Sequence, residues 1–202
     1  MCKKRLLLPL SVWFVCYMAV FGYLEVRPPV EVHLISSPLD SLIPYVPVFI
    51  YPYLGWFPYI CICAWLAFFN LSDKDYKKSL LLLTMGMNLF LAVSLLWPTG
   101  LTLREGIVYD TGRLSGILMR FVQTLDAPKS VFPSMHVYVT LVLQHSLELQ
   151  KDRLPGRALL LGRISAVLII LSTMLTKQHS VIDVAGAILM FLILRALILR
   201  LH

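Results

Sequence analysis

Charged side chains are scarce in this chain. Only 14% of its 202 residues are Asp, Glu, Lys or Arg, whereas about a quarter of the residues in an ordinary soluble domain are charged. Hydrophobic residues account for 58% of the sequence, and the mean hydropathy is +0.79. This composition excludes an ordinary soluble domain and predicts an integral membrane protein, with residues 1–202 forming a single transmembrane domain.

The chain also lacks cysteines in an arrangement suited to disulfide pairing. Its four cysteines are Cys2, near the start, and Cys16, Cys61 and Cys63, inside apolar runs. Cys61 and Cys63 are two residues apart, which places their thiols on different faces of a helix. We therefore interpret the cysteines as small apolar side chains rather than as a disulfide framework.

Long apolar runs dominate what is present. Six of them approach the ~20 residues that a helix needs to cross a bilayer core, which predicts an all-α bundle of six transmembrane helices. The first run follows Lys3, Lys4 and Arg5 but has no A-x-A cleavage site, so we expect it to remain as a span. The expected spans are residues 6–24, 46–69, 79–97, 133–149, 159–176 and 180–199.

The net charge of +7 could by itself indicate a nucleic-acid partner. Its distribution favours membrane topology instead, because twelve of the eighteen Lys and Arg residues fall on one side of the six expected spans. The positive-inside rule then places both termini in the cytoplasm and residues 25–45, 98–132 and 177–179 outside. Prolines are expected to kink the entry to the second span. The tryptophans, which are typical of interfacial belts, are Trp13, Trp56, Trp65 and Trp97.

The stretch TKQHSVIDVAGA, residues 176–187, places ionisable side chains inside an apolar run, which is costly and indicates a function. His179 and Asp183 are four residues apart and share one face of a helix. The carboxylate can fix the imidazole tautomer and leave the other ring nitrogen free to act as a nucleophile. If the last span begins near Gln178, free amide N–H groups at its N-terminus also favour a phosphate. The alternative is a structural histidine–aspartate pair.

A second histidine opens the fourth expected span, in the sequence Pro133-Ser134-Met135-His136. Ser134 precedes an apolar run, as a helix N-cap does. The long loop before it contains WPTGLTLREG at residues 97–106, and long ordered loops tend to be functional. Taken alone, His136 is also compatible with an interfacial histidine.

Three separate stretches thus reach the same outward face of the expected bundle. Cations and hydroxyl groups suit phosphate oxygens, and two histidines suit a nucleophile and a proton-transfer partner. A zinc site made of His136, His179 and Asp183 is an alternative, but neighbouring cations would repel a metal, so no metal is expected. The converging residues are Arg104, Ser134, His136, Lys177, His179 and Asp183.

These motifs resemble those of the type 2 phosphatidic acid phosphatase superfamily, six-span membrane lipid phosphatases and phosphotransferases. The family's P-S-G-H motif is matched by Pro133, Ser134 and His136, with Met135 in place of glycine. Its S-R-x5-H-x3-D motif is matched in register as well. The residues of this chain at the Ser, Arg, His and Asp positions of that motif are Ser172, Thr173, His179 and Asp183.

The remaining family motif, K-x6-R-P, is matched more weakly. Arg104 stands at its arginine position, whereas Trp97 and Glu105 replace its lysine and proline. The stretches WPTGLTLRE and SPLDSLIPYVPVFIYPY, residues 37–53, resemble the bacterial branch related to sphingomyelin and inositol phosphorylceramide synthases. The resemblance covers roughly residues 37–190.

The resemblance implies a phosphohistidine mechanism. His179 would attack phosphorus, Asp183 would orient it, and His136 would protonate the leaving alcohol. Lys177 and Arg104 would supply part of the charge missing at Thr173, although Lys177 is not equivalent to arginine and is also compatible with a snorkelling interfacial lysine. The phosphate-binding residues implied by the motifs and their surroundings are Arg104, Ser134, Lys177 and Ser172.

The implied function is hydrolysis of a lipid phosphomonoester or diphosphate at the outer face of a bacterial inner membrane, without metal or cofactor. The implied partners are membrane lipids and a lipid phosphate such as phosphatidate, phosphatidylglycerol phosphate or an isoprenyl diphosphate, and no nucleic acid. A phospho-headgroup transferase is an alternative that uses the same residues. A catalytically inactive structural or transport protein is a further alternative, which the joint presence of His136, His179 and Asp183 disfavours.

Overall fold

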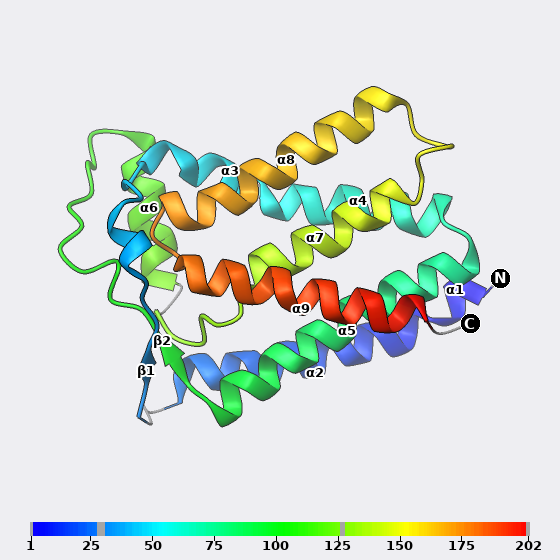
Figure 1. Ribbon diagram of the computed structural model, residues 1–202, viewed down its shortest axis with the longest axis horizontal. Coiled ribbons are helices and arrows are strands. Elements are labelled where there is room, and N and C mark those ends of the chain that lie inside the picture. The colour runs from blue at the N-terminus through cyan, green and yellow to red at the C-terminus, as the bar shows by residue number, and fades with distance from the viewer. Residues whose placement is uncertain (1, 28–30, 126–127, 201–202) are drawn as a thin grey trace.

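The computed structural model describes residues 2–27, 31–125 and 128–200 and is mostly helical (Figure 1). Within these residues, five helical stretches are long and apolar enough to cross a membrane. They are Lys3–Val26, Pro47–Asn70, Asp73–Leu96, Gly156–Leu175 and Val181–Leu199. The expected architecture of apolar helices is therefore confirmed for five of the six spans.

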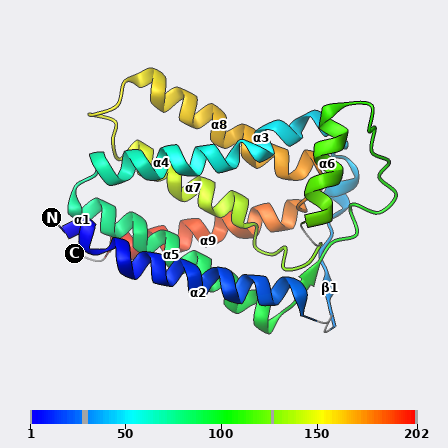
Figure 2. The same ribbon diagram turned by 180° about the vertical axis from the view of Figure 1, so that it is seen from behind.

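The long helices lie side by side and alternate in direction, so that α1 and the end of α9 lie at the same end of the bundle (Figures 1 and 2). We call this the terminal end, and the opposite end, where α7 and α9 begin, the distal end. In chain order the bundle helices are α1 (Cys2–Arg5), α2 (Leu7–Val26), α4 (Trp56–Asn70), α5 (Asp73–Leu96), α7 (Met135–Glu148), α8 (Gly156–Leu175) and α9 (Val181–Leu199).

Helix α7 lies at the centre of the bundle although it is short. Its 14 residues span about 21 Å, which is less than the ~30 Å of a bilayer core. It packs against α4, α5, α8 and α9, and Val137, Tyr138 and Val142 are almost inaccessible. The helix in the expected span 133–149 is therefore shorter than the other long helices and lies in the core of the bundle.

The second expected span, residues 46–69, is divided into short elements. They are η2 (Pro47–Phe49), α3 (Ile50–Leu54) and α4. Pro47 starts η2, and Gly55 separates α3 from α4. Proline fixes φ and has no N–H to donate, so a proline-rich stretch does not continue as one straight helix. The kinked entry that the sequence predicts is confirmed.

The stretch expected to be an outward loop, residues 98–132, contains regular structure. Its strand β2 (Thr99–Gly100) pairs in parallel with β1 (His33–Leu34). Helix α6 (Leu114–Leu125) runs across the distal end of the bundle (Figures 1 and 2). The loop expectation was wrong here, because α6 is amphipathic and too short to stand out as an apolar run. In the described residues, the two short strands are the departure from an all-α fold.

Helices α5 and α7 meet at a glycine–tyrosine contact. The hydroxyl of the buried Tyr138 donates to the carbonyl of Leu82. The Tyr138 ring lies directly against Gly86, and a Cβ built on Gly86 would overlap that ring. The close approach of the two helices therefore requires glycine at this position.

We predict that Gly86→Ala destabilises the protein by about 1–3 kcal/mol, because an added methyl group in a packed core displaces its neighbours. Gly22→Ala is the matched control, since a Cβ on Gly22 of α2 meets nothing within 4 Å. Thermal unfolding of both variants in detergent measures the difference. Equal melting temperatures would contradict the close packing at Tyr138.

Candidate active site

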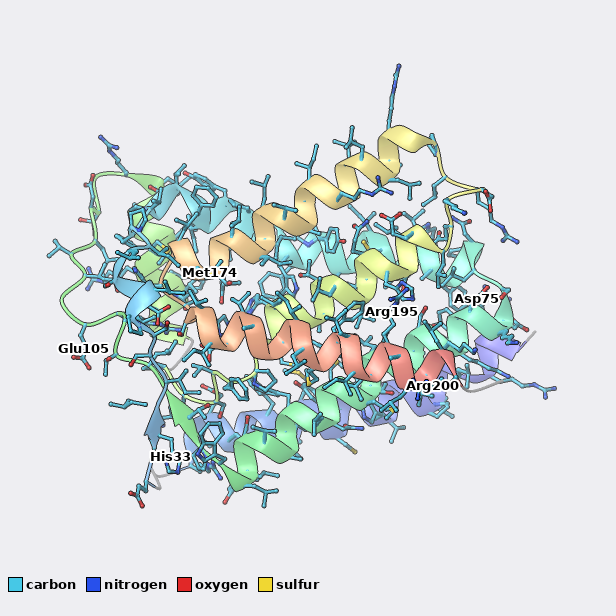
Figure 3. The ribbon with its side chains drawn as sticks, viewed as in Figure 1. His33, Asp75, Glu105, Met174, Arg195 and Arg200 are labelled. Carbon is cyan, nitrogen blue, oxygen red and sulfur yellow. The ribbon has the colours of Figure 1, made fainter. Side chains whose placement is uncertain are left out.

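The distal end brings together the three stretches that carry the candidate residues. Figure 3 shows His33, Glu105 and Met174 at this end, whereas Asp75 and Arg200 lie at the terminal end. Helices α7 and α9 begin at the distal end and α8 ends there. The beginnings of two helices and the end of a third therefore frame the candidate site.

His179 lies in the turn between α8 and α9. The carbonyl of Thr173 accepts hydrogen bonds from the N–H groups of Gln178 (2.9 Å) and His179 (3.0 Å). Lys177 in this turn has a φ of 58°, in the left-handed region that is unfavourable for residues with a Cβ. Such a conformation persists only where surrounding contacts hold it, so the position of His179 is set by what is packed around the turn.

The N-terminus of α9 has its amide groups occupied. Ser180 is the N-cap: its Oγ accepts from the N–H of Ile182 (3.2 Å), and its own N–H donates to Asp183 Oδ2 (2.8 Å). The N–H of Val181 donates to Asp40 Oδ1 (2.9 Å). The expectation of free amide groups for a phosphate was wrong, because the capping box and Asp40 use them. A phosphate at this end depends on side-chain donors.

His179 and Asp183 approach each other as their i, i+4 spacing predicts. Nδ1 of His179 lies 3.4 Å from Oδ2 of Asp183; the Asp183 side chain is fully buried and that of His179 is 11% exposed. Among the described residues, neither His179 Nδ1 nor Asp183 Oδ1 has a hydrogen-bond partner. The two side chains are close together, but no hydrogen bond joins them in this structure. Catalytic hydrogen bonds commonly shorten only when substrate binds.

Ser134 caps α7, as the sequence predicts. Its Oγ accepts from the N–H of Val137 at 3.4 Å. Its own N–H donates to the carbonyl of Asp183 at 3.1 Å, which fastens the start of α7 to the first turn of α9. As a result, the rings of His136 and His179 face each other, with their centroids 5.9 Å apart.

His136 is held between two aromatic rings. The ring of Tyr53 stacks on it at 4.6 Å, and the ring of Trp56 lies at 4.2 Å, both measured between centroids. Trp56 lies at the start of α4, and its ring packs against His136. The indole Nε1 of Trp56 is buried with no hydrogen-bond partner in the described part of the chain. The only sequence signal for this contact is the aromatic and proline-rich stretch 51–58.

Asp40 is a site residue that the sequence analysis missed. It is 4% exposed, and its Oδ2 accepts from Ser180 Oγ (2.7 Å) and from the N–H of Ser37 (2.7 Å). Together with the bond from Val181, these contacts join η1 (Pro38–Ser41) to the N-terminus of α9. The S-P-L-D pattern at residues 37–40 indicates a capped helical turn, but not that its carboxylate reaches a helix 140 residues later.

Lys177 binds the segment that contains Asp40. Its ammonium donates to the carbonyl of Asp40 at 2.7 Å and to the carbonyl of Ile43. An ammonium has three N–H donors, so these contacts use two of them. The side chain thus helps to hold the turn before His179, and its contact with phosphate stays a prediction.

Ser172 and the residue at the family arginine position are both fully buried on α8. The Ser172 hydroxyl donates to the carbonyl of Ile169 (2.6 Å), and the Thr173 hydroxyl donates to that of Ile170 (2.7 Å). Both hydroxyl protons therefore serve the helix itself. The structure does not place Ser172 in a contact with either histidine.

Arg104 lies in the loop that precedes α6, within electrostatic range of the Tyr109 hydroxyl. Tyr109 packs on an apolar cluster that includes Tyr53, and Tyr53 stacks on His136. Arg104 is therefore connected to His136 through Tyr109 and Tyr53.

The described residues form no group of three or more His, Cys, Asp or Glu side chains that could hold a metal ion. The three residues of the alternative zinc site, His136, His179 and Asp183, are near one another but do not form such a group.

We predict that Asp40→Ala lowers the free energy of unfolding by about 2–4 kcal/mol, because two buried donors, Ser180 Oγ and Val181 N–H, lose a charged acceptor. Asp75→Ala is the control: Asp75 also binds an N-cap hydroxyl, that of Ser72 at 2.6 Å, but in an exposed contact at the terminal end. Thermal unfolding in detergent compares the two. Similar small losses would mean that the Asp40 contacts do not stabilise the site.

Comparison with known proteins identifies the family of the chain. The family model described as the PAP2 superfamily matches residues 40–197, a range that begins at Asp40 and includes both motif histidines. No curated protein and no solved structure matched the chain.

Proposed function

Because the chain belongs to the PAP2 superfamily, we propose that it is a membrane lipid phosphatase that acts through a phosphohistidine intermediate. The observation that carries the proposal is the approach of the two motif histidines, whose ring centroids are 5.9 Å apart. His179 is the nucleophile and His136 the general acid. Asp183, 3.4 Å from His179 Nδ1, holds the proton on that nitrogen and leaves Nε2 to attack.

The reaction proceeds in two steps. In the first, His179 Nε2 bonds to phosphorus while the bond from phosphorus to the lipid oxygen breaks; that oxygen keeps the electron pair and takes a proton from His136. In the second, His136 accepts a proton from water, the water oxygen bonds to phosphorus, and the bond to His179 breaks. Orthophosphate and the lipid alcohol are the products.

Stabilisation of the phosphoryl charge falls to side chains, because the amide groups at the start of α9 are occupied. Phosphoryl transfer depends mainly on positioning and charge stabilisation. Lys177 contributes the N–H donor that its carbonyl contacts leave over. Ser172 takes part only if its hydroxyl turns away from the carbonyl of Ile169. The proposed phosphate-binding set is Arg104, Ser134, Lys177 and Ser172, and the mechanism needs no metal.

We further propose that the chain crosses the membrane six times, with both termini in the cytoplasm and the active site facing outward in a bacterial inner membrane. The ends of the bundle support an even number of crossings, because α1 and the end of α9 lie together (Figure 1). The five apolar stretches and α7 make up the six. The excess of Lys and Arg on the terminal side supports the orientation.

A transferase of phospho-headgroups is the second candidate. The stretch 37–53, which resembles the synthase branch, contributes Asp40 and Tyr53 to the site. Both functions begin with a bond from His179 Nε2 to phosphorus, but in the transferase the headgroup stays on that phosphorus. The two then differ in whether water or a lipid alcohol discharges the intermediate.

We predict that His179→Ala reduces phosphate release from vesicles containing phosphatidate, phosphatidylglycerol phosphate or an isoprenyl diphosphate to background, because the nucleophile is lost. His136→Ala is expected to lower the rate about 10²–10⁴-fold, the usual contribution of a positioned acid. His145→Ala is the matched control, since His145 lies further along α7 and packs against Phe191 at 6.2 Å. Each assay is run with and without EDTA.

Several outcomes would overturn parts of this proposal. Unchanged phosphate release by His179→Ala would exclude both enzyme mechanisms. Activity lost in EDTA and restored by zinc would replace the metal-free mechanism with a metal site. Diacylglycerol or ceramide added as an acceptor separates the two candidates, because a transferase yields a phosphorylated acceptor in place of orthophosphate.

The proposed topology predicts opposite labelling of two loops. In a variant without the four native cysteines, Val108→Cys should react with an impermeant maleimide added to intact cells, because Val108 is 89% exposed at the distal end. Asp152→Cys, in the turn between α7 and α8, should react only after the cells are opened. The reverse pattern would invert the orientation, and labelling of both sites in intact cells would contradict the crossing by α7.

A further inference from the structure

Three polar side chains lie near one another at the distal end, and their hydrogen-bonding groups are only partly paired. Tyr45 comes from the segment before η2, Tyr109 from the loop before α6, and Gln123 from α6 itself. The Tyr109 hydroxyl donates to Gln123 Oε1. Within the described residues, the Tyr45 hydroxyl and Gln123 Nε2 are buried and have no hydrogen-bond partner. Buried polar groups without partners are costly and call for an explanation.

These polar groups lie on the His136 side of the site. Tyr45 and Tyr109 pack on the apolar cluster that contains Tyr53, and the Tyr53 ring stacks on His136 at 4.6 Å. Because His136 is the proposed acid, its side of the site is where the leaving group departs.

The groups left over are hydrogen-bond donors. Burial, and after it the neighbouring Tyr109, raises the pKa of Tyr45 to about 12, so its hydroxyl keeps its proton at neutral pH. Gln123 presents two N–H donors on Nε2, while its oxygen is taken by Tyr109. Burial also raises the pKa of Tyr109, and the Arg104 guanidinium opposes this shift, which shows that a positive charge lies nearby. Donors beside a cation suit an anion rich in acceptors.

We propose that Tyr45, Tyr109 and Gln123 line a subsite for a second phosphate of the lipid substrate, the one that is not transferred. This inference rests on the proposed function. It deepens that function, because it makes a lipid that carries two phosphates the favoured substrate class. Each donor without a protein partner then gains a phosphate oxygen as its acceptor.

A lipid diphosphate illustrates the chemistry. His179 Nε2 bonds to the terminal phosphorus while the bond from that phosphorus to the bridging oxygen breaks. The bridging oxygen keeps the electron pair, takes the proton of His136 and leaves as part of a lipid monophosphate. The subsite holds this departing phosphate, and water then releases orthophosphate from His179.

Two substrates that differ only in the second phosphate test the proposal. Farnesyl diphosphate and farnesyl monophosphate are presented in phosphatidylcholine vesicles, and kcat/KM is measured for each. Tyr45→Phe keeps the ring on the cluster and removes only the donor. It should lower kcat/KM for the diphosphate about tenfold, as expected for a lost hydrogen bond to a charged group, and for the monophosphate less than twofold. Gln123→Glu places a negative charge at the subsite. It should lower the ratio of kcat/KM for the diphosphate to kcat/KM for the monophosphate further.

Tyr51→Phe is the control, because Tyr51 of α3 is 46% exposed and lies outside the cluster. Phosphatidylglycerol phosphate and phosphatidate form a second pair, in which the extra phosphate is a diester. A selective loss in either pair supports the subsite and identifies the linkage it accepts. Thermal unfolding verifies that each variant is folded, and either variant alone is sufficient for the test.

Three results would overturn the inference. The wild-type protein could be active while neither Tyr45→Phe nor Gln123→Glu changes the ratio of kcat/KM for the diphosphate to kcat/KM for the monophosphate. That result would exclude the subsite and leave the proposed function intact. Equal losses on both members of each pair would likewise assign these residues to folding. If the wild-type protein releases phosphate from none of the four lipids, the proposed function fails, and the subsite fails with it.

Discussion

The carboxylate of Asp40 joins segments that are far apart in the chain and that meet at the histidines. It accepts hydrogen bonds from the N–H of Ser37, the hydroxyl of Ser180 and the N–H of Val181. A buried carboxylate is costly unless it is fully bonded, and three donors provide those bonds. The carbonyl of the same residue binds the ammonium of Lys177. Lys177 and Ser180 lie on either side of His179 in the chain, so Asp40 contacts the segment of His179 from both sides.

The helices that could be predicted from the sequence are those with long apolar runs. Five long helices can be predicted from composition alone. Helix α6 does not, because only one of its faces is apolar, and it was taken for a loop. The approach of His179 to Asp183 and the cap at Ser134 depend on residues close together in the chain, so the sequence predicts them. Asp40 and Trp56 act through contacts across the bundle, and a single sequence does not specify which distant residues such side chains meet.

The replacement of the family arginine by Thr173 has a local explanation. Thr173 is fully buried, and its hydroxyl turns back to the carbonyl of Ile170, so the side chain serves the end of α8. Its carbonyl accepts hydrogen bonds from the N–H groups of Gln178 and His179. The position thus keeps its backbone role in shaping the turn, while any positive charge must come from other segments. Lys177 is the nearest cation along the chain, but most of its donors hold the Asp40 segment.

Donors are unevenly distributed around the two histidines. On the His179 side the amide groups are occupied. On the His136 side the Trp56 indole, the Tyr45 hydroxyl and the Gln123 amide keep donors that no group in the described part of the chain accepts. A phosphohistidine reaction places charge both on the phosphoryl group and on the departing oxygen. Donors gathered around the departing side stabilise one kind of leaving group more than another. Under the proposed function, substrate selection rests on residues outside the motifs, so the motifs indicate the class of reaction but not the lipid.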